Sequence, residues 1–221
     1  MASSNRSVAL EAKPYHHGNL REELLHLALA DLESTGAPTL SLRDLAARAG
    51  VSKTAPYRHF PDRDALLTAL MDHGWKDLHD ATARAQEAAT DPLSGLRDMG
   101  RAYLAFALAR PGMYRLLFSG EGKSLATGLV CPDAHNSYRL LEAQVARCQS
   151  AGWRPDANGQ ILTLSVWSLV HGAADLALEN LVLAPPGIPP LEFWCSVVDF
   201  VEPAAAPDSA GKAAKRVSRR S

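Results

Sequence analysis

Cysteine is scarce in this chain, with three residues in 221: Cys131, Cys148 and Cys195. They lie far apart without a C-x-x-C pair, so the sequence offers neither a disulfide framework nor a cysteine-based zinc site. The histidines show no H-E-x-x-H spacing either. We therefore expect reduced thiols in a cytoplasmic protein that holds no metal ion and no cofactor.

An excess of charge of one sign is also absent. The 23 lysines and arginines nearly balance 24 aspartates and glutamates, for a formal net charge of -1. That balance argues against a uniformly basic nucleic-acid coat protein. It leaves room for a local basic surface, because charges act over a Debye length of about 8–10 Å. Such a surface is indicated by four cations and one carboxylate in a short segment: Arg48, Lys53, Arg58 and Arg63, with Asp62.

Long uninterrupted apolar runs are missing. No apolar run follows the first charged residues, so we expect no signal peptide. The most apolar stretch, residues 161–183, is interrupted by His171, Asp175, Glu179 and Asn180. These groups are costly inside a bilayer. We interpret the stretch as a buried or interface helix and expect no membrane partner.

Strand alternation and internal repeats are not evident, which predicts an all-α fold. Apolar residues at helical spacing predict a first helix over residues 19–35, ended by Gly36, and Asp62 is a candidate cap for a later helix. Further helices are predicted at 92–109, 113–118, 133–150, 156–184 and 190–201. From Trp75 the composition becomes alanine-rich. These shifts divide the chain into four segments, at residues 1–18, 19–74, 75–202 and 203–221.

Residues 41–59 have the pattern of a helix-turn-helix. Ser41 and Asp44 form an S-x-x-D box, which starts a helix by satisfying its free N–H groups. Gly50 tolerates the left-handed conformation that a sharp turn needs. Ser52 can cap a second short helix rich in polar and basic side chains. In such a motif the first helix braces the second, which enters a DNA major groove.

The stretch SLRDLAARAGVSKTAPYRHFPDRDALL, residues 41–67, closely resembles the DNA-binding region of the TetR family of transcriptional regulators. Residues 19–36 are similar to that family's first helix. The resemblance implies a ligand-responsive regulator, a repressor that binds a palindromic operator in double-stranded DNA as a homodimer. A small, mostly apolar effector would release it.

The same resemblance assigns a role to each segment. Residues 19–74 would form a three-helix helix-turn-helix DNA-binding domain, and residues 75–202 a C-terminal α-helical domain for ligand binding and dimerisation. Residues 1–18 would be a flexible arm. Residues 203–221 would be a disordered basic tail, because they contain too few apolar groups to offset the entropy of ordering.

The DNA-contacting residues implied by the resemblance lie in both helices of the motif and at the start of the next helix. They are Ser41, Arg43, Ser52, Lys53, Thr54, Ala55, Tyr57, Arg58, His59 and Arg63. Thr54 can bond a base, and the Ala55 methyl can contact a thymine methyl. Tyr57 has an alternative role, packing partly into the core, where Phe60 is also expected. The arm offers further candidates in Lys13, Tyr15, His16 and His17.

Pro56 departs from the motif, which usually has a branched aliphatic residue at this place. Proline forfeits one backbone hydrogen bond and disfavours helical geometry at the preceding Ala55. We expect the second helix to persist, because the ring is apolar and the lost bond lies near the helix start.

The C-terminal part resembles the family more loosely. ARPGMYRLLF at 109–118 is similar to the short helix that follows a proline there, and VWSLVHG at 166–172 is similar to the Trp-x-x-x-His-Gly signature of one C-terminal subgroup. Candidate pocket residues are Tyr103, Phe106, Met113, Leu117, Phe118, Trp167 and His171. Candidate residues of a dimer surface are Val170, Ala174, Leu178, Leu181, Phe193, Trp194 and Val197. Each pocket candidate also has an alternative role as an ordinary core residue.

Two other functions remain open at this point. His171 and Asp175 share a helical face and could serve an all-α enzyme with a C-terminal pocket, although no placed nucleophile or phosphate-binding glycine motif accompanies them. A constitutive architectural DNA binder is the second alternative. Such a protein would not need the large apolar C-terminal part, which favours the ligand-responsive regulator.

Overall fold

The predicted first helix is present as α1, Leu20–Thr35, in a computed structural model that describes residues 20–118 and 132–199. Leu24, Ala28 and Leu32 are fully buried at the predicted spacing. Gly36 ends the helix with a φ of 85°, a left-handed conformation that glycine adopts without strain. The predicted arm, the tail and Cys131 lie outside the described residues.

The described residues form helices and no strand, which confirms the all-α prediction. They fall into two compact units that divide between Leu67 and Thr68. The N-terminal unit holds α1, the short 3-10 helix η1 (Ala37–Thr39), α2 (Leu42–Arg48) and η2 (Ala55–Arg58).

The core of the N-terminal unit comes from residues that the motif places on inner faces. Leu45 and Ala46 of α2 are fully buried, and Phe60 is 2% exposed, as expected for a core residue. Ser41 caps α2 by accepting a bond from the N–H of Asp44 at 3.4 Å. Gly50 makes the turn after α2 with a φ of 69°. The first half of the motif therefore folds as its sequence predicts.

The second half differs from the prediction. Ser52 does not start an α-helix; only the 3-10 turn η2 forms, and Pro56 is buried within it. Proline has no N–H to donate and disfavours helical geometry at Ala55, so the effect of Pro56 is larger than the loss of one bond. The backbone N–H groups of His59 and Phe60 both reach the Pro56 carbonyl at 2.9 Å.

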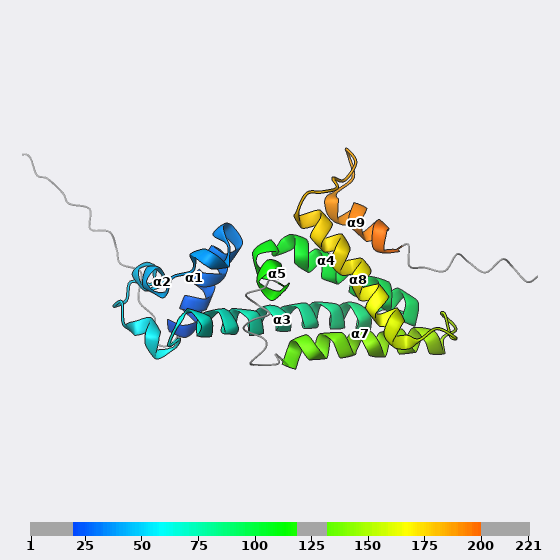
Figure 1. Cartoon of the computed structure of the whole chain (residues 1–221), viewed down its shortest axis with the longest axis horizontal. Helices are drawn as coiled ribbons and strands as arrows, with labels where there is room; N and C mark the ends of the chain where they lie inside the picture. Colours follow the sequence, from blue (N-terminus) through cyan, green and yellow to red (C-terminus); the bar gives the residue numbers. More distant parts are fainter. Residues whose placement is uncertain (1–19, 119–131, 200–221) are drawn as a thin grey trace, which may run out of the picture. The chain divides into compact units, whose positions relative to one another are not determined.

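Helix α3, Arg63–Ala88, runs without interruption through the boundary predicted at residue 74 (Figure 1). The composition changes at Trp75, but the helix continues through this position. Gly74 lies inside the helix because space is short there: a Cβ at this position would meet the buried Met113 sulfur at 2.3 Å.

The C-terminal unit adds five further helices among the described residues. They are α4 (Pro92–Ala109), α5 (Pro111–Phe118), α7 (Pro132–Ser150), α8 (Gly159–Leu178) and α9 (Pro190–Asp199). Helix α4 is central, since it packs against α5, α7, α8 and α9. It begins at a capping box in which Asp91 accepts bonds from the N–H groups of Leu93 and Ser94.

Helix α8 ends at Leu178, earlier than predicted, and Asn180 follows with a φ of 52°. Arg115 of α5 donates to the Leu178 carbonyl at 3.2 Å, which satisfies one free acceptor at the helix end. By length and composition alone α8 could cross a membrane, a test that the core helix of a soluble protein also passes.

Candidate nucleic-acid surface and apolar cavity

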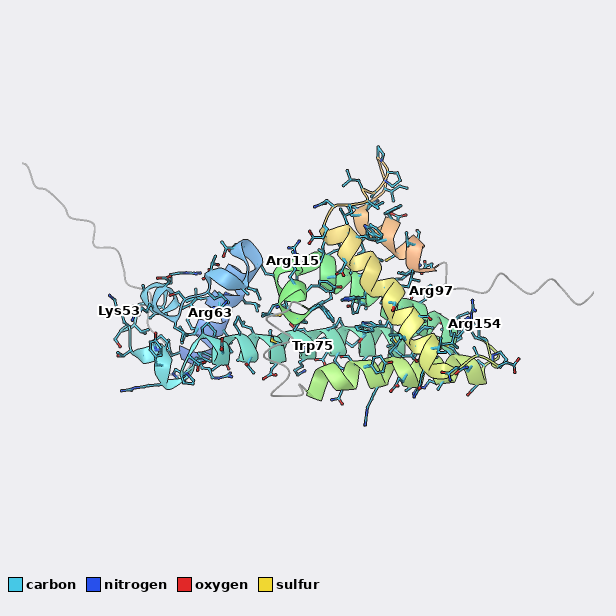
Figure 2. All side chains as sticks on the ribbon, viewed as in Figure 1. Lys53, Arg63, Trp75, Arg97, Arg115 and Arg154 are labelled. Atoms are coloured by element: carbon cyan, nitrogen blue, oxygen red, sulfur yellow. The ribbon has the colours of Figure 1, made fainter. Side chains whose placement is uncertain are left out.

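The turn after α2 exposes most of the residues predicted to contact DNA. Arg43, Ser52, Lys53, Thr54, Tyr57, Arg58 and His59 are exposed, while Ser41 and Ala55 are half-buried. Lys53 and Arg63 are labelled in Figure 2. The 3-10 geometry of η2 thus leaves a polar, basic surface accessible to a large partner.

Not every cation of this segment is available. Arg48 forms an ion pair with Asp31 of α1. Arg63 is half-buried and donates to the Ala37 carbonyl at 2.7 Å, so it joins η1 to the start of α3. Arg43, Lys53 and Arg58 form no ion pair with any described residue. These three carry the positive charge that the surface can offer.

Tyr57 and Phe60 have different environments. Tyr57 is 43% exposed, next to Arg58 and His59. Phe60 is buried and lies under the Arg21 guanidinium, which is 5.4 Å from the ring centroid. Tyr57 therefore keeps a side chain that a partner can reach.

The C-terminal unit contains an apolar cavity of about 250 Å³. Side chains from five helices line it: Trp75, Leu78 and Thr82 of α3; Leu96, Met99, Gly100 and Tyr103 of α4; Phe118 of α5; Ser137, Tyr138 and Leu141 of α7; Val166, Trp167 and Val170 of α8. Aromatic rings meet edge to face on two sides. Trp75 and Phe118 have centroids 5.1 Å apart, and Tyr138 and Trp167 lie 6.3 Å apart.

Three of the predicted pocket residues line this cavity: Tyr103, Phe118 and Trp167. The other four lie elsewhere in the packing. Met113 and Leu117 face Gly74, and Phe106 lies beneath the Arg110 guanidinium at 5.8 Å. His171 lies beside Phe118, with ring centroids 4.7 Å apart, but is not part of the lining. These four lie outside the described lining.

A hydrogen-bonded group joins the cavity wall to α8. The Tyr103 and Tyr114 hydroxyl oxygens lie 2.9 Å and 2.8 Å from Nδ1 of His171. The Tyr114 hydroxyl also donates to Asp175 at 3.1 Å. Burial raises the pKa of both phenols well above their usual value near 10.

Most of the lining was missed by sequence reasoning. Trp75, Leu78 and Thr82 fall on one face of α3, a spacing that the sequence displays. That spacing identifies an inner face but does not distinguish a cavity wall from an ordinary core. Gly100, which lines the cavity, also differs from Gly74: a Cβ at Gly100 would meet nothing within 4 Å, whereas one at Gly74 would meet Met113.

The predicted dimer surface needs a correction. Val170, Ala174 and Trp194 are 6%, 0% and 4% exposed, because they pack inside the protomer. Leu178, Phe193 and Val197 are half-buried, and Leu181 is exposed in the loop after α8. The outward face of α8 instead carries Ile161, Leu164 and Leu176, followed by exposed Leu181, Val182, Leu183, Ile188 and Leu191.

His171 and Asp175 do come together, with Nε2 of the histidine 3.7 Å from the carboxylate. The Nδ1 atom faces two phenols rather than a serine, threonine or cysteine nucleophile. Among the described residues no group of three or more His, Cys, Asp or Glu could hold a metal ion.

Two family models match the chain. Residues 24–70 match "Bacterial regulatory proteins, tetR family", and residues 96–201 match "Tetracyclin repressor-like, C-terminal domain". The first covers the motif around α2 and η2, and the second covers most of the cavity-forming helices.

Individual relatives agree. The nucleoid occlusion factor SlmA of Vibrio cholerae is 35% identical over 100 residues, which cover 45% of this chain and 51% of that protein. The chain thus spans about half the length of the curated relatives it matches. A protein of unknown function from Rhodococcus sp. RHA1 is 34% identical, with a TM-score of 0.71 over 86% of this chain and 97% of the other. The fatty acid degradation regulator FadR of Bacillus halodurans shares the fold, at 13% identity and a TM-score of 0.66 over 83% and 95% of the two chains.

Proposed function

This chain belongs to the TetR family of bacterial regulatory proteins, and from that membership we propose that it is a cytoplasmic transcriptional repressor controlled by a small effector. The observation that carries the proposal is the exposed basic surface around η2. Arg43, Lys53 and Arg58 are free of ion pairs with described residues, and Ser52 and Thr54 add hydroxyls beside them.

The proposed roles of these residues follow from their chemistry. Lys53 and Arg58 would contact phosphates or guanine edges, and Thr54 would reach a base. Tyr57 and His59 would contact the backbone of the duplex. Arg63 is assigned mainly to structure, since its guanidinium already bonds the Ala37 carbonyl.

We assign the partner subunit to the outward face of α8. Ile161, Leu164 and Leu176 are 65%, 51% and 39% exposed on a helix whose other side is buried. An apolar face of this kind is stabilised when a second copy covers it. Two reading surfaces related by a twofold axis would then bind half-sites spaced by about 34 Å or a multiple.

The cavity in the C-terminal unit would receive the effector. A ligand shifts an equilibrium between two conformers only by its difference in affinity for them. Release from the operator therefore requires that the effector bind the DNA-incompetent conformer more tightly. A coupling of about 1–3 kcal/mol is typical for such linked sites.

The enzyme alternative has weaker support. His171 and Asp175 are hydrogen-bonded to phenols behind the wall, and the described lining offers no placed nucleophile. A constitutive architectural DNA binder would leave the cavity without a role.

Selection of bound fragments from random duplex DNA tests the proposal. The expected product is an inverted repeat, retained by the wild-type protein and lost by Lys53→Ala/Arg58→Ala. Sequences without twofold symmetry, or no retained DNA at all, would reject a dimeric operator-binding repressor.

A further inference from the structure

The cavity lining indicates the chemical class of the effector. Among the residues that the structure describes, none of those lining the cavity is an aspartate, glutamate, lysine, arginine or histidine. Aromatic rings form a large part of the wall, from Trp75, Tyr103, Phe118, Tyr138 and Trp167. An ion placed here would lose its hydration without gaining a charged partner, which is costly.

Two of the lining hydroxyls are already committed. The Tyr103 hydroxyl bonds Nδ1 of His171 at 2.9 Å. The Thr82 hydroxyl, 3.0 Å from the carbonyl oxygens of both Leu78 and His79, donates within its own helix. Both hydroxyls therefore already have a partner within the protein.

The remaining polar groups are few. The Tyr138 hydroxyl and the Trp75 indole N–H make no hydrogen bond with any described residue, although each ring is held by an edge-to-face contact. An occupant can therefore gain one or two hydrogen bonds, and a rigid aromatic surface provides most of its contact area.

The size of the cavity adds a second limit. At about 250 Å³ it lies below the range of about 300–1,000 Å³ that drug-sized ligands occupy. This volume favours a ligand smaller than a typical drug.

We infer that the effector is an uncharged, ring-bearing compound, smaller than a typical drug, with one or two hydrogen-bonding groups. This inference rests on the proposed function and specifies the ligand of the same cavity. A carboxylate is disfavoured because the described lining residues include no cation. Aromatic rings can hold a quaternary ammonium by cation–π attraction. Here edge-to-face contacts occupy part of the ring surfaces, and the described lining residues supply no anionic side chain to offset the lost hydration.

Isothermal titration of the full chain with three compounds of one shape tests the inference: methyl 1-naphthoate, 1-naphthoate and trimethyl(1-naphthyl)ammonium. The ester is expected to bind, and each ion to bind at least ~100-fold more weakly. Comparable binding of either ion to the wild-type protein would overturn the inference. So would no binding of the ester, 1-naphthol or indole.

A matched pair of variants locates the binding. Ser137 is half-buried in the lining, whereas its neighbour Asn136 is exposed and outside it. Ser137→Arg should weaken ester binding and strengthen 1-naphthoate binding, each by ~10-fold or more, because it supplies a cation. Asn136→Arg should change neither. Equal effects of the two variants, or none from Ser137→Arg in a protein with unchanged helicity, would contradict the assignment.

Operator binding is measured on the same samples. If the wild-type protein retains DNA but binds neither the ester nor 1-naphthol nor indole, only the effector class is rejected. If the wild-type protein binds no operator DNA, the proposed function itself is rejected.

Discussion

The Tyr103 hydroxyl oxygen lies 2.9 Å from Nδ1 of His171, and this contact joins α4 to α8. Tyr103 lines the cavity, while His171 lies one turn from Asp175, whose side chain reaches the outer side of α8. The contact therefore connects the wall that an effector would touch to the helix that we assign to the partner subunit. A displacement of the Tyr103 ring would therefore act directly on the His171 ring.

The buried phenols predict a loss of stability at high pH. Burial raises the pKa of the Tyr103 and Tyr114 hydroxyls well above the usual tyrosine value near 10. Above about pH 10 the unfolded chain releases these protons while the folded protein keeps them, so the free energy of unfolding falls as pH rises. Urea unfolding at pH 8 and pH 11 should show a smaller fall in Tyr103→Phe/Tyr114→Phe than in the wild type. Equal falls would show that the phenols do not titrate this way.

Two helix glycines should respond in opposite directions to the same substitution. In Gly74→Ala the new Cβ meets the Met113 side chain, which is fully buried, so a loss of about 1 kcal/mol or more in the free energy of unfolding is expected. In Gly100→Ala the Cβ meets nothing within 4 Å, and the gain in helix propensity should stabilise by up to ~1 kcal/mol. Denaturant titration measures both, and destabilisation by Gly100→Ala would contradict the open space beside α4.

The outward face of α8 predicts the effect of a surface charge on assembly. Leu164→Glu places a carboxylate on a side chain that is 51% exposed in the protomer, so folding should be preserved. A desolvated charge at a subunit contact is costly, and sedimentation should show monomers. Ala146→Glu on the exposed side of α7 is the control and should leave the dimer intact. A dimeric Leu164→Glu would place the partner elsewhere.

Local signals in the sequence were sufficient for much of the fold. The spacing of Leu24, Ala28 and Leu32, the cap at Ser41 and the turn at Gly50 each depend on neighbours within a few residues. Such features follow from hydrogen-bonding and steric rules that act along the chain. The exposure of the cations around η2 could likewise be predicted from residues close to them in the sequence.

Features that depend on distant partners could not be predicted. The cavity lining combines the expected Trp167 with Trp75 and Tyr138, which were not predicted to line it and which meet it only after three helices pack. Helix α8 is apolar on several sides, so periodicity did not separate buried Val170 and Ala174 from exposed Leu164. The α-helix predicted after Ser52 was wrong for a local reason: Pro56 disfavours a short α-helix more strongly than expected, and only the 3-10 turn η2 forms.

The most direct test of the central claim is operator affinity measured against salt concentration. With the selected duplex, Lys53→Ala/Arg58→Ala should bind ~10-fold or more weakly and reduce the slope of log K against log salt by about 4, one for each of the phosphate contacts that the two protomers lose. Arg84→Ala/Arg147→Ala removes the same charge from exposed sites in the C-terminal unit and should retain near wild-type affinity. An unchanged affinity and slope in the first variant, or an equal loss in the second, would contradict a DNA-reading role for the surface around η2.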